Sequence, residues 1–313
     1  MTVSIGYLLP TRERVMNGQP QTRELLRLAE HAQALGFDSL WVGDSLLARP
    51  RHDPLTILAA VAARTTAVSL GTAILLPVLR NPVVLAQQVA TLDQITEGRL
   101  ILGVGIGADT PAIRAEFIAA GIPFESRLGR TLEGLRLCRA LWTGEPVHWN
   151  GRWQLNGQVL GPTPYQPGGP PIWMGTSVLP GLQRTGKHFD GWFPLGPDAQ
   201  VWRERWIEVQ ASARGANRDG AVTGAMYCTI SLHDDAFEAE RILDAYLGQY
   251  YAPAPVAMMR RVQACYAGVP EGLQAWLAEF VNAGVSHLVL RFAGDHDRHL
   301  AFVSRMRTQQ RVG

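Results

Sequence analysis

Short apolar runs alternate with longer segments of helical spacing along the first third of the chain. Continuous apolar runs of this kind are typical of strands in a parallel sheet that is covered on both faces. They predict four strands, at Ser4–Leu9, Ser39–Val42, Val68–Leu76 and Arg99–Val104.

The segments between these strands predict helices. Residues Arg23–Leu35 carry apolar side chains at helical spacing, and Gly36 follows as a C-cap. Asp53-Pro54 and Asn81-Pro82 each place a capping side chain before a proline at the first helical position. Strands and helices therefore alternate as they do in βαβ units.

The remainder of the chain continues this alternation with two interruptions. Residues 109–125 are expected to form an insertion after the fourth strand, and Tyr250–Val269 a second, irregular excursion late in the chain. His148–Leu155 contains Asn150-Gly151 between aromatic residues, which predicts a hairpin turn. Four further strands are expected at Pro171–Gly175, Asp190–Phe193, Val222–Leu232 and His287–Phe292. Further helices are expected at Ser126–Trp142, Asp235–Tyr246 and Glu271–Ala283, and one that follows the strand at Asp190–Phe193 and ends near Arg214.

Eight strands that alternate with helices predict an α/β fold, a (β/α)8 TIM barrel. Such a barrel needs roughly 250 residues, and the insertions after strand 4 and late in the chain account for most of the surplus in 313 residues. No linker divides the sequence, so we expect residues 1–313 to form a single domain.

Composition narrows the class of protein. The net charge is +2 and there is no basic block, which argues against a nucleic-acid partner. No segment is long and apolar enough to span a bilayer, and the first residues lack the pattern of a signal peptide. Cys138, Cys228 and Cys265 form no disulfide framework and are expected to fill packing sites. These features predict a cytoplasmic protein with no membrane partner.

A glycine-rich run, Gly103-Val104-Gly105-Ile106-Gly107, ends the fourth predicted strand. The dinucleotide fingerprint needs G-x-G-x-x-G at the first strand and a helix directly after it. Here the spacing is G-x-G-x-G, and an insertion follows. In a barrel, glycines on one face of a strand either relieve packing or leave room for a flat ligand. The end of this strand is a candidate site because barrel active sites lie at the carboxyl ends of the strands.

Several segments together resemble the luciferase-like flavin-dependent oxidoreductase superfamily. They are LGFDSLWVGDS (35–45), LGTAILLPVLRNPVVLAQQVATLDQITEGRLILGVGIG (70–107), ALWTGEP (140–146), GPPIWMGTS (169–177) and FDGWFP (189–194). The resemblance implies a (β/α)8 barrel that binds FMN or the deazaflavin coenzyme F420 at the carboxyl ends of the strands. It also implies a small-molecule substrate and a homodimer.

The resemblance also assigns cofactor-binding positions. A bulge after the third strand falls at Ala73-Ile74, where the family often has a non-proline cis peptide, and Thr72 precedes it. Gly175-Thr176-Ser177 resembles the family's phosphate-binding loop, although an ordinary strand-to-helix turn has a similar composition. Gly107 and Ala108 line the end of the fourth strand. Tyr7 and Trp192 could flank the flavin, although aromatic residues at those depths are more often core.

Asp44, Ser45 and Asp109 are the catalytic candidates. Asp44 could accept a hydrogen bond from the cofactor or substrate, or could simply cap a turn. In much of the F420 branch the aspartate is followed by histidine, but here Ser45 follows. Some F420 enzymes have a carboxylate at the position of Ala108, and Asp109 is one position away. Arg291 could hold an anion or pair with Asp295 or Asp297.

The segment Asp295-His296-Asp297-Arg298-His299 looks like a metal cluster. The first strand has no His-x-His, the frequent mark of metal-dependent barrels. We therefore expect His296 and His299 to lie in a solvated helix start, and no metal site.

The leading hypothesis is an FMN-type monooxygenase that uses reduced FMN and oxygen on a small organic substrate, with a separate flavin reductase as a possible supplier. An F420-dependent reductase or dehydrogenase is the alternative, disfavoured only by Ser45 and Ala108. A metal-dependent barrel hydrolase and a catalytically silent flavin-binding protein are further alternatives.

Overall fold

The computed structural model describes residues 3–312, and their strands form a closed parallel barrel. The pairing order β9-β11-β1-β2-β3-β4-β7-β8 returns to β9, and β10 adds to β9 outside this ring. The described registers between ring strands are parallel. The ring strands are β1 (Ser4–Leu8), β2 (Ser39–Val42), β3 (Ser69–Thr72), β4 (Leu100–Val104), β7 (Ile172–Met174), β8 (Gly191–Trp192), β9 (Thr223–Leu232) and β11 (His287–Phe292). The predicted TIM barrel is confirmed.

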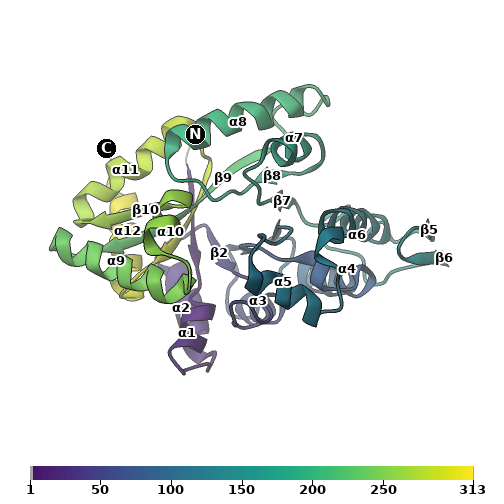
Figure 1. Ribbon diagram of the computed structural model, residues 1–313, viewed down its shortest axis with the longest axis horizontal. Helices are drawn as coiled ribbons and strands as arrows, with labels where there is room; N and C mark the ends of the chain where they lie inside the picture. Colours follow the sequence, from purple (N-terminus) through teal and green to yellow (C-terminus); the bar gives the residue numbers. More distant parts are fainter. Residues whose placement is uncertain (1–2, 313) are drawn as a thin grey trace. The chain divides into compact units, whose positions relative to one another are not determined.

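Contacts divide the chain into two compact units. Unit 2 consists of Thr11–Thr22 and Val42–Ile172. Beyond its strands it contains α1 (Thr11–Met16), α3 (Pro54–Ala62), the 3-10 helix η1 (Pro77–Leu79), α4 (Pro82–Ile95), α5 (Pro111–Ala119), the 3-10 helix η2 (Phe124–Ser126), α6 (Arg127–Leu141), and the hairpin strands β5 (Val147–Asn150) and β6 (Gln154–Gln158) (Figure 1).

Unit 1 consists of Met1–Pro10, Arg23–Trp41 and Trp173–Gly313. It contains α2 (Arg23–Ala34), α7 (Leu179–His188), α8 (Ala199–Arg214), α9 (Ala236–Tyr251), α10 (Val256–Val262), β10 (Ala264–Gly268), α11 (Pro270–Ala283) and α12 (His296–Val312). The expectation of a single domain stays a prediction.

Two helices of unit 2 begin as their sequence predicts. The Asp53 carboxylate accepts the Thr56 N–H, and the Asn81 side chain accepts the Val83 N–H. A proline follows each cap, so the missing N–H costs no helical hydrogen bond. These caps fix where the chain leaves the ends of β2 and β3 and enters the helix layer.

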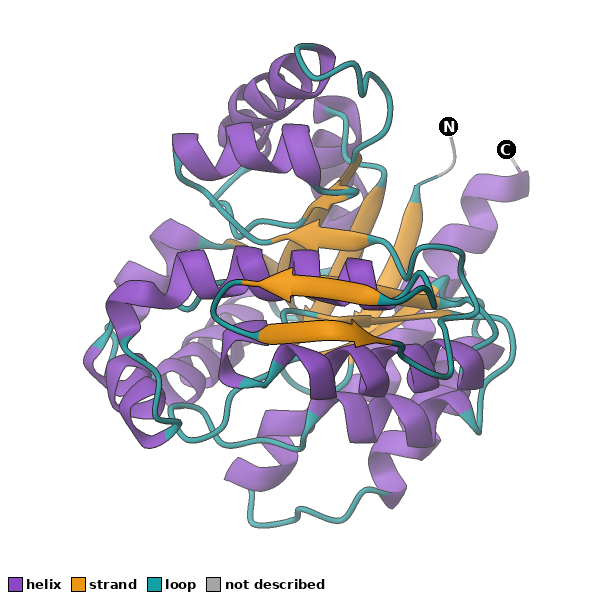
Figure 2. Cartoon of the chain, turned by 90° about the vertical axis from the view of Figure 1, so that its right-hand side faces the viewer, coloured by secondary structure: helices purple, strands orange, loops and turns teal. Residues whose placement is uncertain are grey.

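The hairpin that Asn150-Gly151 predicted forms in unit 2 from β5 and β6. Asn150 pairs with Gln154, so residues 151–153 form a three-residue loop. The Glu133 carboxylate of α6 accepts the Arg152 N–H at 2.7 Å and also pairs with the Arg152 guanidinium. These contacts tie the loop to α6. Figure 2 shows the two antiparallel strands in front.

The late excursion contains one strand that the sequence reading missed. Residues Ala264–Gly268 form β10, which pairs in parallel with the second half of β9. β9 is ten residues long, and only Thr223 and Gly224 pair with β8. β8 therefore leaves the rest of that edge of β9 without a partner, and β10 pairs with its second half. The mixed polarity of ACYAG gave no clear strand pattern on its own.

The barrel interior of unit 1 is filled by large rings around His287. The ring of His287 lies 5.5 Å from that of Trp41 and 5.2 Å from that of Trp173. Ser39 Oγ accepts a hydrogen bond from Trp41 Nε1, so its own O–H can donate to His287 Nε2, 2.7 Å away. A Cβ at Gly6 would lie 2.3 Å from Ser39 Oγ, so β1 needs glycine there. This layer closes the lumen by packing.

No helix among residues 3–312 is long and apolar enough to cross a membrane. The three cysteines are free; Cys138 and Cys228 are fully buried, and burial raises the pKa of the Cys138 thiol to about 12.

Candidate functional site

Asp44, at the carboxyl end of β2, is tied to the segment that follows β3. Its side chain is only 1% exposed, and its two oxygens accept both terminal nitrogens of Arg80, at 2.6 and 3.1 Å. The Leu76 N–H donates to the same carboxylate, and Arg80 also reaches Asp53 at 3.0 Å. Asp44 therefore holds the turn after β3 in place. To act as a base it would first have to break this ion pair.

Ser45 belongs to a network around Glu116, a residue that the sequence reading did not single out. Glu116 of α5 is 1% exposed, and its Oε2 accepts from Ser45 Oγ and from the N–H groups of Leu47 and Ala48, all within 2.8 Å. Ser45 Oγ in turn accepts the Arg49 N–H. The insertion after β4 thus fixes the loop after β2, and Ser45 positions that loop.

Replacing Glu116 should destabilise unit 2 because it removes the one acceptor that three donors share, of which the Ser45 hydroxyl is buried. We expect Glu116→Ala to lower the free energy of unfolding by about 3 kcal/mol or more, and Ser45→Ala by about 1 kcal/mol. Urea unfolding followed by circular dichroism measures both. Glu116→Gln retains one acceptor oxygen and should fall between them; an unchanged midpoint for Glu116→Ala would contradict this account.

Arg51 is a second residue that sequence reasoning missed. A Cβ at Gly43 would lie 2.1 Å from Arg51 Nη1 and 3.5 Å from the carbonyl oxygen of Ala73. The Arg51 guanidinium therefore occupies the space above Gly43, the residue that follows β2, near the Ala73 carbonyl after β3. Only the glycine at position 43 signalled that a group approaches the backbone here.

The turn after β3 has the backbone form that the resemblance implied. The Ala73–Ile74 peptide is cis. Thr72 is fully buried, and its hydroxyl donates to the Gly103 carbonyl of β4 at 2.7 Å. A Cβ at Gly105 would lie 2.2 Å from Ile74 Cδ1, so the side chain of Ile74 packs directly on the β4 backbone. Gly105, directly after β4, thus allows this close approach.

Beyond β4 the chain turns outward. Gly107 has φ +82°, a conformation that favours glycine, and Ala108 is exposed. Asp109 is also exposed and receives two hydrogen bonds from Arg114, at 2.6 and 2.9 Å. That arginine lowers the pKa of the Asp109 carboxyl. Asp109 is therefore an ionised surface group, a poor proton donor.

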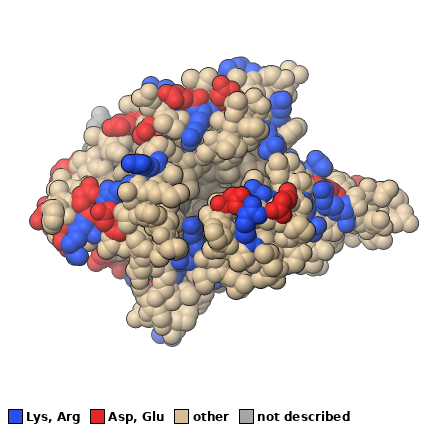
Figure 3. Space-filling view, viewed as in Figure 1, with Lys and Arg blue, Asp and Glu red and all other residues tan. Residues whose placement is uncertain are grey.

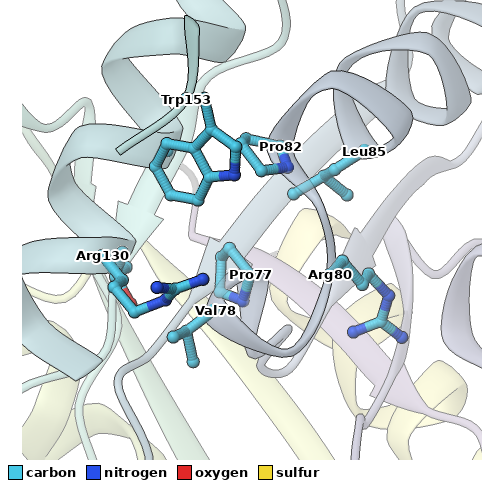
Figure 4. A pocket seen from close by; sticks show the side chains of 9 residues that line it. Pro77, Val78, Arg80, Pro82, Leu85, Arg130 and Trp153 are labelled. Atoms are coloured by element: carbon cyan, nitrogen blue, oxygen red, sulfur yellow. The ribbon is translucent and has the colours of Figure 1, made fainter. Parts of the chain in front are cut away.

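Unit 2 also has a small hollow (Figure 4). Arg80 forms part of its wall, and the Arg130 guanidinium lies 5.4 Å from the Trp153 ring. The hollow lies among η1, the start of α4, α6 and the hairpin loop. Its lining consists of Pro77, Val78, Arg80, Pro82, Leu85, Arg130, Thr131, Gly134 and Trp153.

In unit 1, the predicted phosphate loop Gly175-Thr176-Ser177 leads into α7. Val178, the residue before this helix, provides no side-chain cap; Pro180 has no N–H, and the N–H groups of Gly181 and Leu182 donate to the Val178 carbonyl. The Thr176 carbonyl accepts Trp192 Nε1 at 2.9 Å, and Ser177 Oγ donates to the Leu195 carbonyl at 3.0 Å. These contacts fix the loop at the positive end of the α7 dipole, which suits an anion.

Tyr7 and Trp192 are both fully buried among aromatic rings. Tyr7 stacks on Phe292 at 5.2 Å, and its hydroxyl lies 2.8 Å from His296 Nδ1. Trp192 packs on Trp202 of α8, with ring centres 5.2 Å apart. Both face the helix layer, where they act as packing residues; Trp192 also positions the loop at Thr176.

The acidic and histidine-rich segment differs from its sequence prediction. His299 is only 2% exposed: its Nδ1–H donates to the Asp295 carbonyl and its Nε2 accepts the Leu232 N–H at 2.9 Å. The prediction that it is solvated is therefore wrong, because α12 packs on the end of β9. Asp297 pairs with Arg27 and His31, so Arg291 does not pair with it. Among the described residues, no group of three or more His, Cys, Asp or Glu could hold a metal.

Acidic and basic side chains are interspersed on the face that Figure 3 shows, and neither sign dominates it. Such a surface offers no continuous basic stripe for a phosphate backbone.

Comparison with known proteins decides the family. The model of the family described as luciferase-like monooxygenase matches residues 3–297. This chain belongs to that family. It is therefore a luciferase-like oxidoreductase, as its sequence segments implied.

The relatives of this luciferase-like protein include enzymes named for coenzyme F420. The F420-dependent glucose-6-phosphate dehydrogenase 1 of Rhodococcus jostii is 28% identical, over 95% of this chain and 94% of the relative. The F420-dependent glucose-6-phosphate dehydrogenase of Gordonia bronchialis is 32% identical, over 63% of this chain and only 60% of that relative.

A solved structure named as a monooxygenase shares the fold. Monooxygenase RslO1 from Streptomyces bottropensis has a TM-score of 0.84 at 24% identity, covering 98% of this chain and 99% of that one. At this identity the likeness shows the barrel alone.

Proposed function

We propose that this protein is an F420-dependent oxidoreductase that transfers a hydride between the deazaflavin and a small organic substrate. The observation that carries the proposal is the likeness to F420-dependent dehydrogenases along nearly the full chain. We therefore prefer F420, the alternative cofactor of the sequence analysis, to FMN. When bound, the deazaflavin would accept or donate the hydride.

Residues of unit 1 suit the phosphate group of such a cofactor. We assign that group to Gly175-Thr176-Ser177, because the loop lies at the positive end of the α7 dipole and Trp192 holds it. This assignment is a proposal.

The ion pairs of the two candidate carboxylates also limit which side chains can transfer a proton to or from the substrate. Asp44 is paired with Arg80, and Asp109 is paired with Arg114. Neither is a free carboxylate, so we propose that Asp44 and Ser45 position the loop ends and do not carry the proton. This proposal replaces the catalytic roles expected from the sequence.

An FMN-dependent monooxygenase remains a second candidate for a specific reason. Ser45 and Ala108 stand where the F420 branch commonly has a histidine and a carboxylate, and the Ser45 hydroxyl is engaged by Glu116.

An assay on one panel of alcohols and sugar phosphates separates the two candidates. We expect anaerobic loss of the absorbance of oxidised F420 with at least one member, and no substrate-dependent oxygen uptake with reduced FMN. Oxygen uptake with reduced FMN, and no change in F420, would instead establish the monooxygenase.

A further inference from the structure

Arg291 of β11 is a buried cation without a carboxylate partner. Its side chain is 1% exposed, and its acceptors are the Tyr251 hydroxyl, the Thr229 hydroxyl and the Gln263 carbonyl oxygen, at 2.8–2.9 Å. All three are neutral oxygens. The rings of Tyr227, Tyr246, Tyr250 and Tyr251 surround the guanidinium at 4.5–5.2 Å. A buried charge normally has an opposite charge beside it, because leaving water is costly.

Two buried donors in this cluster, Nε of Arg291 and the amide nitrogen of Gln263, have no acceptor. The hydroxyl of Ser231, two residues after Thr229 on β9, also has no hydrogen-bond partner. Gln263 and Ser231 are both fully buried. The Gln263 amide turns its oxygen to Arg291, so its nitrogen remains next to the cation without a partner. Each unsatisfied buried polar group carries a free-energy cost, and one oxyanion could accept from all three donors.

The cluster lies on the lumen face, toward the carboxyl ends of the strands. His287 packs on Trp41 of β2 and Trp173 of β7, strands that are not neighbours of β11 in the ring, so its side chain points into the barrel. Side chains alternate along a strand, so Arg291, four residues further on, faces the same way. Thr229 is its register partner on β9, and Ser231 follows on the same face. Barrel active sites lie at this end.

We propose that Arg291, Gln263 and Ser231 form a subsite for an anionic group of the substrate, a carboxylate or a phosphate. The inference rests on the proposed oxidoreductase function and deepens it: the substrate carries an acidic group. Arg291 also bonds Tyr251 and Gln263, the residues just before and just after the segment 252–262. The same cation thus holds both ends of this segment.

Anion binding tests the subsite in protein saturated with cofactor, so that the phosphate loop is already filled. We expect sodium phosphate or sodium acetate to raise the melting temperature more than sodium chloride at equal ionic strength. Stabilisation by phosphate alone indicates a phosphate ester as substrate, and by acetate alone a carboxylate.

Variants locate the effect. Gln263→Glu would supply an internal carboxylate, so we expect it to raise the melting temperature without added anion and to weaken anion binding at least tenfold. Arg291→Gln should weaken binding at least tenfold and Ser231→Ala severalfold. Arg136→Gln, at an exposed position of α6, is the matched control and should bind like the parent chain.

Two results would overturn the subsite: stabilisation by neither anion beyond chloride, or full anion binding in both Gln263→Glu and Arg291→Gln. Failure of the proposed oxidoreductase function is distinguished from failure of the anion subsite by the cofactor-binding result. If neither F420 nor FMN binds, the titration is run on protein without cofactor, where the same variants still report on Arg291.

Discussion

Thr176→Asp should abolish cofactor binding. FMN and F420 both carry a phosphate group, and we assign that group to the loop Gly175–Ser177 before α7. A carboxylate in this loop would lie against the phosphate and repel it, and would oppose the favourable field of the helix start. We expect the dissociation constant to rise at least about 100-fold, which corresponds to about 2.7 kcal/mol. Titration of cofactor absorbance or fluorescence measures the change.

Controls separate charge from shape at this position. The Thr176 side chain packs closely on α7, where a Cβ at Gly181 would lie 2.0 Å from Thr176 Oγ1. Thr176→Asn introduces a side chain of almost the same size as that of Thr176→Asp but without the charge, and Thr176→Ser keeps the hydroxyl. We expect both to retain most of the affinity. Equal affinity in Thr176→Asp and the parent chain would show that the phosphate binds elsewhere.

Acidification should destabilise the protein through two buried histidines. Burial lowers the pKa of His287 from 6.5 to about 4, and burial likewise lowers the pKa of His299 to about 4. In the unfolded chain both rings take up protons near pH 6.5. Between about pH 6.5 and pH 4 the unfolded state therefore binds more protons than the folded state, and stability falls as the pH falls. We expect each histidine to cost about 3 kcal/mol across this window.

Urea unfolding at a series of pH values tests this expectation. His287→Phe keeps an aromatic ring against Trp41 and Trp173 and removes the titrating group, so its stability should depend less on pH in this window. His148→Gln, at an exposed position of the hairpin, is the control and should follow the parent chain. A parent chain whose stability is constant between pH 6.5 and pH 4 would contradict the burial argument.

The barrel could be predicted because its signals are local. β2 was predicted to the residue, and Asp53 and Asn81 cap their helices as expected. A buried parallel strand must be continuously apolar and a helix start must satisfy its N–H groups, so both leave marks in short segments of sequence.

The site was less predictable because its contacts join distant residues. Glu116 reaches Ser45 across 71 positions, and Arg80 reaches Asp44 across 36. Nothing near Asp44 or Ser45 in the sequence shows that each already has a partner. Arg291 was expected to hold an anion or pair with a nearby aspartate, but its hydrogen bonds go to neutral oxygens on other elements, 28–62 residues away in the sequence.

Equilibrium dialysis of the unmodified protein against F420 and, in parallel, against FMN tests the central claim most directly. The account predicts one F420 bound per chain at micromolar concentration or below, and weaker binding of FMN. Saturable binding of FMN together with no binding of F420 would contradict it.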